Sequence, residues 1–283
     1  MKIAAAVILY YPDESVIKNI LSYSNLVEKL YLIDNSETSS KLTTENVERF
    51  GNPVYIHDGE NKGIAARLNQ VGNLAINEGF EWLLTMDQDS LFEEETFVSY
   101  LNCVAGFDKK ENVSTFGINH MEKLAYSDIC ISTQVNHLIT SGSILNLGLV
   151  NGIGGFDEKL FIDEVDFEYC VRSIVKGFDV IQFPHIFLNH NLGTTSQHRS
   201  LKNAQITPRV LHSPVRIYYM TRNFLYVQSK YNKKFPEEIK RRKKVLINRF
   251  KNNIFYNRER FKVMKNIVKG FWDFKKSRMG KLK

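Results

Sequence analysis

The stretch LLTMDQDSL (Leu83–Leu91) begins as an apolar run and ends in two aspartates separated by one residue. An apolar run without alternation indicates a strand that is buried on both faces of a sheet. Because residues i and i+2 of an extended chain point the same way, the carboxylates of Asp87 and Asp89 can converge on one cation. Such oxygen ligands suit Mg²⁺ or Mn²⁺. The same tripeptide is also common in solvated turns, so its meaning depends on what surrounds it.

Short apolar runs of the same kind recur along the first half of the chain, separated by helical patterns. The expected strands are Ile3–Leu9, Lys29–Ile33, Pro53–His57 and Trp82–Met86. One helix is expected after a turn at Pro12-Asp13 and runs to about Val27, and another runs from Ile64 to Glu78. This alternation predicts an α/β fold with a mostly parallel sheet flanked by helices. Ligands of such sheets bind beyond the carboxyl ends of the strands. Polar clusters stand at those ends, at residues 10–13, 34–36 and 87–89, and together they indicate a binding site.

The second half of the chain is less regular. We expect a strand over Leu138–Leu145, a helix that ends at Gly177, and a strand over Val180–Leu188 that lies near a sheet edge because Pro184 interrupts it. After about Ser196 the pattern becomes helical and basic.

Composition bounds the class of protein. The chain has 283 residues and 43% hydrophobic content, enough for one ordinary domain plus an extension. No apolar run is long enough to span a bilayer. The three cysteines (Cys103, Cys130 and Cys170) are odd in number, scattered and without a CxxC pair, which favours a reducing compartment. We therefore expect a cytoplasmic protein.

Charge divides the chain into an acidic body and a basic tail. Residues 230–283 carry 20 Lys and Arg against four acids, about +16, whereas residues 1–229 carry about −9. Aromatic residues interleave with the basic ones in the tail. Basic amphipathic helices of this kind bind anionic lipid surfaces. The same charge could bind nucleic acid, but no recognisable reading motif accompanies it, so we expect a membrane surface and no nucleic acid. A merely solvated helical hairpin is the plainer alternative.

Three further groups of residues have two readings each. Gly63 and Arg67 open the Ile64–Glu78 helix, whose N-terminus would favour a phosphate, although a turn glycine and a solvated arginine are as well supported. Asp163 and Glu164 lie in FIDEVDFEY, where a carboxylate could serve as a general base or Asp163 could simply cap the helix. His190 follows an apolar strand and could complete a metal site or be structural.

Taken in order, these motifs resemble inverting family-2 glycosyltransferases of the GT-A fold, and most closely the bacterial rhamnosyltransferases that use dTDP-rhamnose. The resemblance covers Ile3 to about Lys230. The motifs that carry it are LYYPD (Leu9–Asp13), LIDNS (Leu32–Ser36), the spacing of Asn61, Gly63, Ala65 and Asn69, MDQDS (Met86–Ser90), SGS (Ser141–Ser143), Gly154–Asp166, His190–Gly193 and Tyr218–Asn223. It implies a GT-A domain over 1–196, with a nucleotide-binding half to about 114 and an acceptor half over 115–196, and a basic helical extension over 197–283.

The resemblance also implies roles for individual residues. Asp163 is implied as the base, with Glu164 as contender because many relatives carry their acid at that position. For the donor, Tyr11 and Asp13 are implied to flank the nucleoside, Asp34 to bind the edge of the nucleobase, and Asp87 to lie near the ribose or the metal. The implied metal ligands are Asp89, Asp87 and His190. Gly63 and Arg67, at the start of their helix, are further candidates for donor binding, and Arg222 could steady the diphosphate.

The implied function is the metal-dependent, inverting transfer of rhamnose from dTDP-rhamnose to a glycan acceptor, lipid-linked and met at the inner face of the cell membrane. Two alternatives stay open. A UDP-sugar such as UDP-galactofuranose or another hexose could be the donor, because no motif specifies the sugar. The chain could also be a non-catalytic glycan- or lipid-binding module, although such a module would not need all of Asp87, Asp89, Asp163 and His190.

Overall fold

The computed structural model describes residues 1–39, 47–51, 53–120, 129–190, 195–199 and 205–282. The chain divides into two compact units. The first comprises Met1–Phe161 and Val165–Asn191, and the second comprises Ile162–Glu164 and Leu192–Lys283. Three residues from the middle of the chain therefore belong with its C-terminal part.

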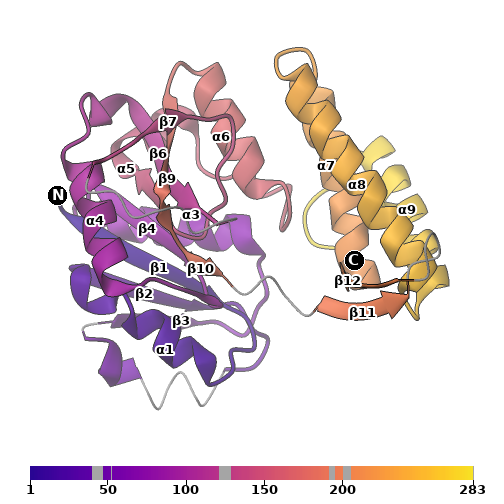
Figure 1. The fold of residues 1–283 in the computed structure, drawn as a ribbon, viewed down its shortest axis with the longest axis horizontal. Helices are drawn as coiled ribbons and strands as arrows, with labels where there is room; N and C mark the ends of the chain where they lie inside the picture. The colour runs from indigo at the N-terminus through magenta and orange to yellow at the C-terminus, as the bar shows by residue number, and fades with distance from the viewer. Residues whose placement is uncertain (40–46, 52, 121–128, 191–194, 200–204, 283) are drawn as a thin grey trace. The chain divides into compact units, whose positions relative to one another are not determined.

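The first unit is built on one mixed sheet (Figure 1). Its strands, in spatial order, are β3 (Pro53–His57), β2 (Lys29–Asp34), β1 (Ile3–Leu9), β4 (Trp82–Asp87), β8 (Ser143–Asn146), β6 (Val113–Asn119), β9 (Asp179–Phe187) and β7 (Thr133–Gln134). The strands β3, β2, β1 and β4 are parallel, and β8 runs antiparallel to both of its neighbours. The carboxyl ends of β1, β2 and β4 therefore meet at one edge, as the alternation of strands and helices predicts. A separate short ladder joins β5 (Ser90–Leu91) to β10 (Asn189–His190).

Helices cover both faces of this sheet. They are α1 (Ser15–Leu21), α3 (Ile64–Asn77), α4 (Glu94–Ala105), α5 (Leu147–Ile153) and α6 (Val165–Val175), with short 3₁₀ turns η1 (Ser24–Leu26), η2 (Val47–Phe50) and η3 (Lys110–Asn112). Side chains alternate between the faces along each strand. On β9, Ile181 packs in one core cluster with residues of α1 and α4, whereas Val180 packs on the other side with Cys170 of α6.

The strands β1 and β3 have the predicted bounds, but the expected first helix and the expected strand over Leu138–Leu145 do not. The first helix ends at Leu21, because Ser22 donates its hydroxyl to the carbonyl of Asn19 and the 3₁₀ turn η1 follows. Of the expected strand over Leu138–Leu145, only the part from Ser143 onward is a strand, and it continues to Asn146 as β8. Gly142 adopts a φ of +73° and donates its amide to the carbonyl of Thr85, so the residues before β8 form a turn.

The second unit combines a hairpin with three helices. Its elements are β11 (Thr195–Arg199), β12 (Ile206–Val210), α7 (Pro214–Tyr231), α8 (Pro236–Tyr256) and α9 (Arg260–Lys275). The expectation of helix directly after Ser196 is therefore wrong, because β11 and β12 pair before α7 begins. α7 and α9 approach closely at Gly270, where a Cβ would lie 2.8 Å from the carbonyl oxygen of Tyr218. None of the described helices has the length and apolar character that a bilayer crossing requires.

The cysteines differ from the expectation of reduced thiols. Cys103 of α4 and Cys130 form a disulfide across 27 residues of sequence, with Cα atoms 5.4 Å apart. Cys170 is a buried free thiol. A spacing this long carries no local signature, so the sequence offered no reason to pair these two residues.

Candidate functional site

The two aspartates stand in a turn that is fastened to the end of β1. Between them, Gln88 accepts from the amide of Tyr10 at 2.7 Å and donates its own side-chain amide to the Tyr10 carbonyl at 3.2 Å. The carbonyl of Gln88 accepts in turn from the side chain of Asn19 in α1. The residue between the aspartates thus binds backbone on the neighbouring strand and fixes the turn.

A second set of contacts fastens the other side of this turn. The buried hydroxyl of Ser141 accepts from the amide of Asp87 at 3.2 Å and donates to the hydroxyl of Ser90 at 2.8 Å. Ser90 is paired through its backbone with His190 in the β5–β10 ladder. His190 is therefore brought, by its backbone, beside the residue that follows Asp89.

The chemistry of this turn fits a hard divalent cation. Two carboxylates in alternation are ligands that Mg²⁺ or Mn²⁺ accepts. Among the side chains that the structure describes, no three such groups gather closely enough to form a metal centre. The side chain of His190 is outside that described set.

The end of β2 carries a buried carboxylate. Asp34 accepts from the amide of Ser36 at 3.0 Å and from the hydroxyl of Tyr55 at 2.7 Å, and it has no exposed surface. Burial and the charge of Asp34 raise the pKa of the Tyr55 phenol. Asp34, predicted to bind the nucleobase of the donor, therefore also holds the turn at Asn35-Ser36 in place.

The end of β1 presents Tyr11 and Asp13 to solvent. Tyr11 has a φ of 44° and donates its amide to the hydroxyl of Ser36 at 2.7 Å. A non-glycine residue in the left-handed region is uncommon, and such residues cluster at functional sites. Asp13 accepts from the hydroxyl and amide of Ser15, and these bonds lower the pKa of its carboxyl.

Arg67, predicted to bind the donor, is fully buried and fully committed to protein acceptors. Its guanidinium forms a two-pronged pair with Asp58, at 2.5 and 2.9 Å. It also donates to Asn35, Gln70 and the carbonyl of Glu60, which accounts for all five of its N–H groups. Arg67 consequently positions the loop before α3 rather than offering a free N–H to a ligand.

Gly63 lies where α3 approaches Phe161. It has a φ of +82°, and a Cβ would lie 2.6 Å from the carbonyl oxygen of Phe161. That carbonyl accepts from the amide of Ile64 at 2.7 Å. The first amide of α3, expected to be open to a phosphate, is thus occupied by the chain itself.

The loop that leads to the FID motif (Phe161–Asp163) is held in place by two residues for which the sequence predicted no such role. Asn69 of α3 donates to the carbonyl of Phe156 and accepts from its amide. Arg172 of α6 donates to the carbonyls of Ile153, Gly154 and Gly155 and pairs with buried Glu168. A long-range bond to a backbone carbonyl leaves no pattern in the sequence, which is why these roles were missed.

The two candidate general bases, Asp163 and Glu164, follow this loop. They lie in a strained segment that belongs to the second unit. Asp163 and Glu164 have φ values of 62° and 66°, and Phe161 has 63°. Such conformations cost about 1–3 kcal/mol each and persist only where surrounding contacts enforce them. Asn223 of α7 supplies such contacts by donating to the carbonyls of Ile162 and Asp163 at 2.6 and 3.1 Å.

Both predicted bases are paired with arginines of the second unit. Asp163 accepts from Arg216 at 3.2 Å through Oδ1, and its Oδ2 has no hydrogen-bond partner among the described residues. Glu164 accepts from both Nε and Nη2 of Arg242, at 3.0 and 2.7 Å. The alternative that Asp163 caps α6 is not supported, because its carboxylate is directed to Arg216. Neither arginine was identified from the sequence.

Arg222, predicted to steady a diphosphate, is buried within the second unit. It donates to the carbonyl of Gly280 at 2.7 Å and stacks over Tyr218 and Tyr219, with its guanidinium carbon 5.2 and 5.1 Å from their ring centres. These contacts join α7 to the C-terminal residues of the chain.

Comparisons with known proteins found one similar sequence and several similar structures. No family model matches the chain. A curated relative, the dTDP-rhamnosyl transferase RfbF of Shigella flexneri, is 31% identical over 183 residues, which are 58% of this chain and 59% of the relative. The structure of S. aureus TarS 1–349 in complex with UDP-GlcNAc superposes with a TM-score of 0.55 at 14% identity, over 97% of this chain and 80% of that one. GalNAc-T7 with UDP, GalNAc and Mn²⁺ superposes with a TM-score of 0.54 at 10% identity, over 67% and 44%.

The chain has the GT-A fold of glycosyltransferases. Its predicted fold class is thereby confirmed, and so is the resemblance to rhamnosyltransferases, as a similarity in sequence over somewhat more than half of the chain. The matched region is 59% of the length of the rhamnosyl transferase, so the match does not by itself assign the activity of that protein to this chain.

Proposed function

We propose that the protein is an inverting glycosyltransferase that moves rhamnose from dTDP-rhamnose to a sugar hydroxyl on a lipid-linked precursor of a surface polysaccharide. One observation carries the proposal. The Asp87–Asp89 turn is fastened to the ends of β1 and β10, in a chain that is 31% identical over 183 residues to a dTDP-rhamnosyl transferase.

On the donor side, Tyr11, Asp13 and Asp34 border the nucleoside, and the turn holds the diphosphate end. Mg²⁺ or Mn²⁺, held by Asp89, Asp87 and His190, would supply the positive charge that stabilises the leaving diphosphate. The presence of Mn²⁺ in the GalNAc-T7 structure supports this choice of cofactor. Gln88 and Ser141 keep the two aspartates in register, and Arg67 keeps the neighbouring loop in place.

On the acceptor side, Asp163 takes the proton of the attacking hydroxyl. Arg216 orients one oxygen of this carboxylate, and Oδ2, which is buried and has no hydrogen-bond partner among the described residues, is the oxygen that accepts the proton. The hydroxyl oxygen attacks the anomeric carbon from the face opposite the diphosphate, so that the configuration at this carbon inverts. Glu164, bound through one oxygen to two nitrogens of Arg242, is the less available of the two acids.

The test is to incubate the protein with Mg²⁺ or Mn²⁺ and a panel of nucleotide sugars, measuring donor binding by calorimetry and the release of nucleoside diphosphate. We expect dTDP-rhamnose to bind and to be consumed, and chelation of the metal to abolish consumption. A protein that neither binds nor consumes any donor would overturn the proposed activity. Consumption of UDP-sugars alone would retain the activity and replace the donor.

A further inference from the structure

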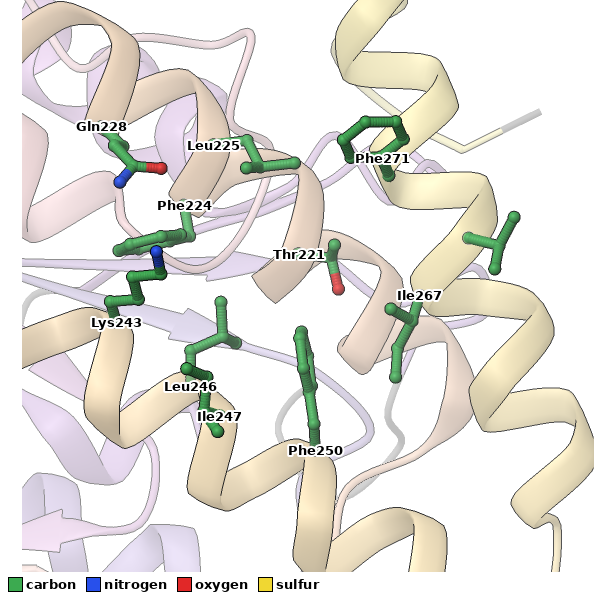
Figure 2. A pocket seen from close by; sticks show the side chains of 11 residues that line it. Thr221, Phe224, Leu225, Gln228, Lys243, Leu246, Ile247, Phe250, Ile267 and Phe271 are labelled. Carbon is green, nitrogen blue, oxygen red and sulfur yellow. The ribbon is translucent and has the colours of Figure 1, made fainter.

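The second unit contains an apolar pocket that none of the roles above uses. It has a volume of about 410 Å³, within the range of small-molecule sites. Three helices line it (Figure 2). α7 contributes a stripe at helical spacing, with Thr221, Phe224, Leu225 and Gln228.

The other two helices complete an apolar wall. α8 contributes Leu246, Ile247 and Phe250, and α9 contributes Ile267, Val268 and Phe271. Figure 2 shows Lys243 and Gln228 together on one side of the pocket and Phe250 and Ile267 toward the other. The pocket therefore has a polar end and an apolar end.

The pocket opens onto an exposed apolar stripe. Phe261, Met264, Val268 and Phe271 follow one another at helical spacing on α9, and they are 70%, 38%, 55% and 42% exposed. Val268 and Phe271 belong both to this stripe and to the pocket wall. An apolar path thus leads from the outer surface of α9 into the pocket.

The charge at the polar end indicates what would enter. Lys243 is exposed and has no carboxylate within ion-pair distance in the described part of the chain. The two preceding residues of α8 are paired instead, Arg241 with Glu238 and Arg242 with Glu164. An ammonium group beside an apolar pocket suits an amphiphile with an anionic head.

We propose that this pocket binds the hydrocarbon chain of a phosphate-bearing lipid, with its phosphate at Lys243. The inference rests on the proposed function in one respect only, since a lipid-linked acceptor belongs to this class of molecule. A membrane phospholipid has the same chemistry, so the experiment separates the two sources.

The test measures binding to the full-length protein by calorimetry, with three probes below their micelle concentrations: farnesyl phosphate, farnesol and dihexanoyl phosphatidylglycerol. We expect farnesyl phosphate to bind, and Val268→Trp to weaken it about tenfold by excluding roughly two methylene groups. Val245→Trp is the matched control, because Val245 is 46% exposed on α8 and does not line the pocket. This control should change the affinity less than about twofold.

The phosphate is tested by Lys243→Gln, with Lys244→Gln as the control outside the pocket. Lys243→Gln should weaken the binding of farnesyl phosphate by up to about fivefold, since an exposed charge pair contributes little more. The binding of farnesol should be unchanged. A preference of at least about tenfold for farnesyl phosphate over the phospholipid would identify an isoprenoid source. Equal affinity would identify a membrane phospholipid.

The proposal is overturned if farnesyl phosphate does not bind, or if Val268→Trp and Val245→Trp bind it alike. It is also overturned if Val268→Trp converts a dimer to a monomer in sedimentation, because a second copy would then fill the pocket. No nucleotide sugar is needed for binding. If every donor is inert and farnesyl phosphate still binds as expected, the pocket stands and only the enzymatic activity fails.

Discussion

At the scale of single residues, the two acids of the FID motif differ in what they can still accept. Asp163 keeps one oxygen without a hydrogen-bond partner among the described residues, whereas Glu164 binds two nitrogens of Arg242. We expect Asp163→Asn to reduce transfer at least about a thousandfold, near the upper part of what general-base catalysis supplies. Donor binding should be unchanged, and calorimetry checks it. Glu164→Gln is the comparison, and transfer that survives Asp163→Asn but not Glu164→Gln would reassign the base.

The burial of Arg67 leads to a prediction about the free energy of unfolding. Asp58 binds both Arg67, which has no exposed surface, and Lys62, whose side chain is 44% exposed. Replacing Arg67 with Met leaves the Asp58 carboxylate without its buried partner and should lower the free energy of unfolding by about 3 kcal/mol. Lys62→Met removes only an exposed pair and should cost less than about 1 kcal/mol. Urea denaturation measures both, and equal losses would mean that Arg67 does not organise the loop.

At the scale of elements, α3 depends on a glycine at its first turn and tolerates change further along. A Cβ at Gly63 would lie 2.4 Å from the ring of Phe161 at a φ of +82°, whereas a Cβ at Gly72 of the same helix meets nothing within 4 Å. Gly63→Ala should therefore destabilise the fold by more than about 1 kcal/mol. Gly72→Ala should stabilise it by up to about 1 kcal/mol, because alanine favours helix. Thermal unfolding should separate the two variants in opposite directions.

His212, which lies two residues before α7, should make the stability of the second unit depend on pH. The amide of His212 donates to the side chain of Asn253 in α8, and its carbonyl accepts from Asn257 at the C-cap of that helix. Burial, with the charges of Arg216 and Arg249, lowers the pKa of His212 from 6.5 to about 4. The unfolded chain therefore binds more protons between these values, so this contribution to stability is complete above pH 6.5 and is lost as pH falls toward 4.

His212→Gln keeps both backbone contacts and removes the titrating ring. The melting temperature of the variant should therefore fall less than that of the wild type between pH 6.5 and 4. Other groups titrate in the same window in both proteins, so the difference between the two curves isolates His212. Parallel curves would show that the His212 pKa is not lowered by folding.

The elements that the sequence predicted are those whose signal is local. The apolar run at Ile3–Leu9 marks β1 with its observed bounds, because a strand buried on both faces of a parallel sheet has no polar face. The short run at Pro53–His57 likewise marks β3, although this strand lies at the sheet edge and is half-buried throughout. The hairpin of β11 and β12 was missed, since the residues of β12 alternate between exposed and half-buried and carry no apolar run. The acidic residues of the candidate site could likewise be predicted from the sequence. Their partners could not, because Arg216, Arg242 and Asn223 are each more than 50 residues away along the chain, and no spacing pattern relates residues that far apart.

At the scale of the whole molecule, the charge asymmetry of the chain has a local focus on α9. Lys265 and Lys275 of α9, and Lys276 at its C-cap, lie on the same side as exposed Phe261 and Trp272, by the 100° step of an α-helix. Cations beside exposed aromatic residues suit the surface of an anionic membrane. We propose that this side of α9 is the one by which the protein meets the bilayer.

Replacing these three lysines with glutamine should weaken binding to vesicles of phosphatidylglycerol about a hundredfold, since each lysine near an anionic surface contributes about 1 kcal/mol. Lys18, Lys109 and Lys159 of the first unit are the matched set, because their replacement lowers the net charge of the chain by the same amount. If net charge alone governs binding, the two triple variants will lose affinity equally and the proposed role of α9 is wrong. If α9 is the contact, the first-unit variant should stay within about threefold of the wild type, and raising the salt from 0.1 to 0.5 M should weaken the wild type far more than the α9 variant.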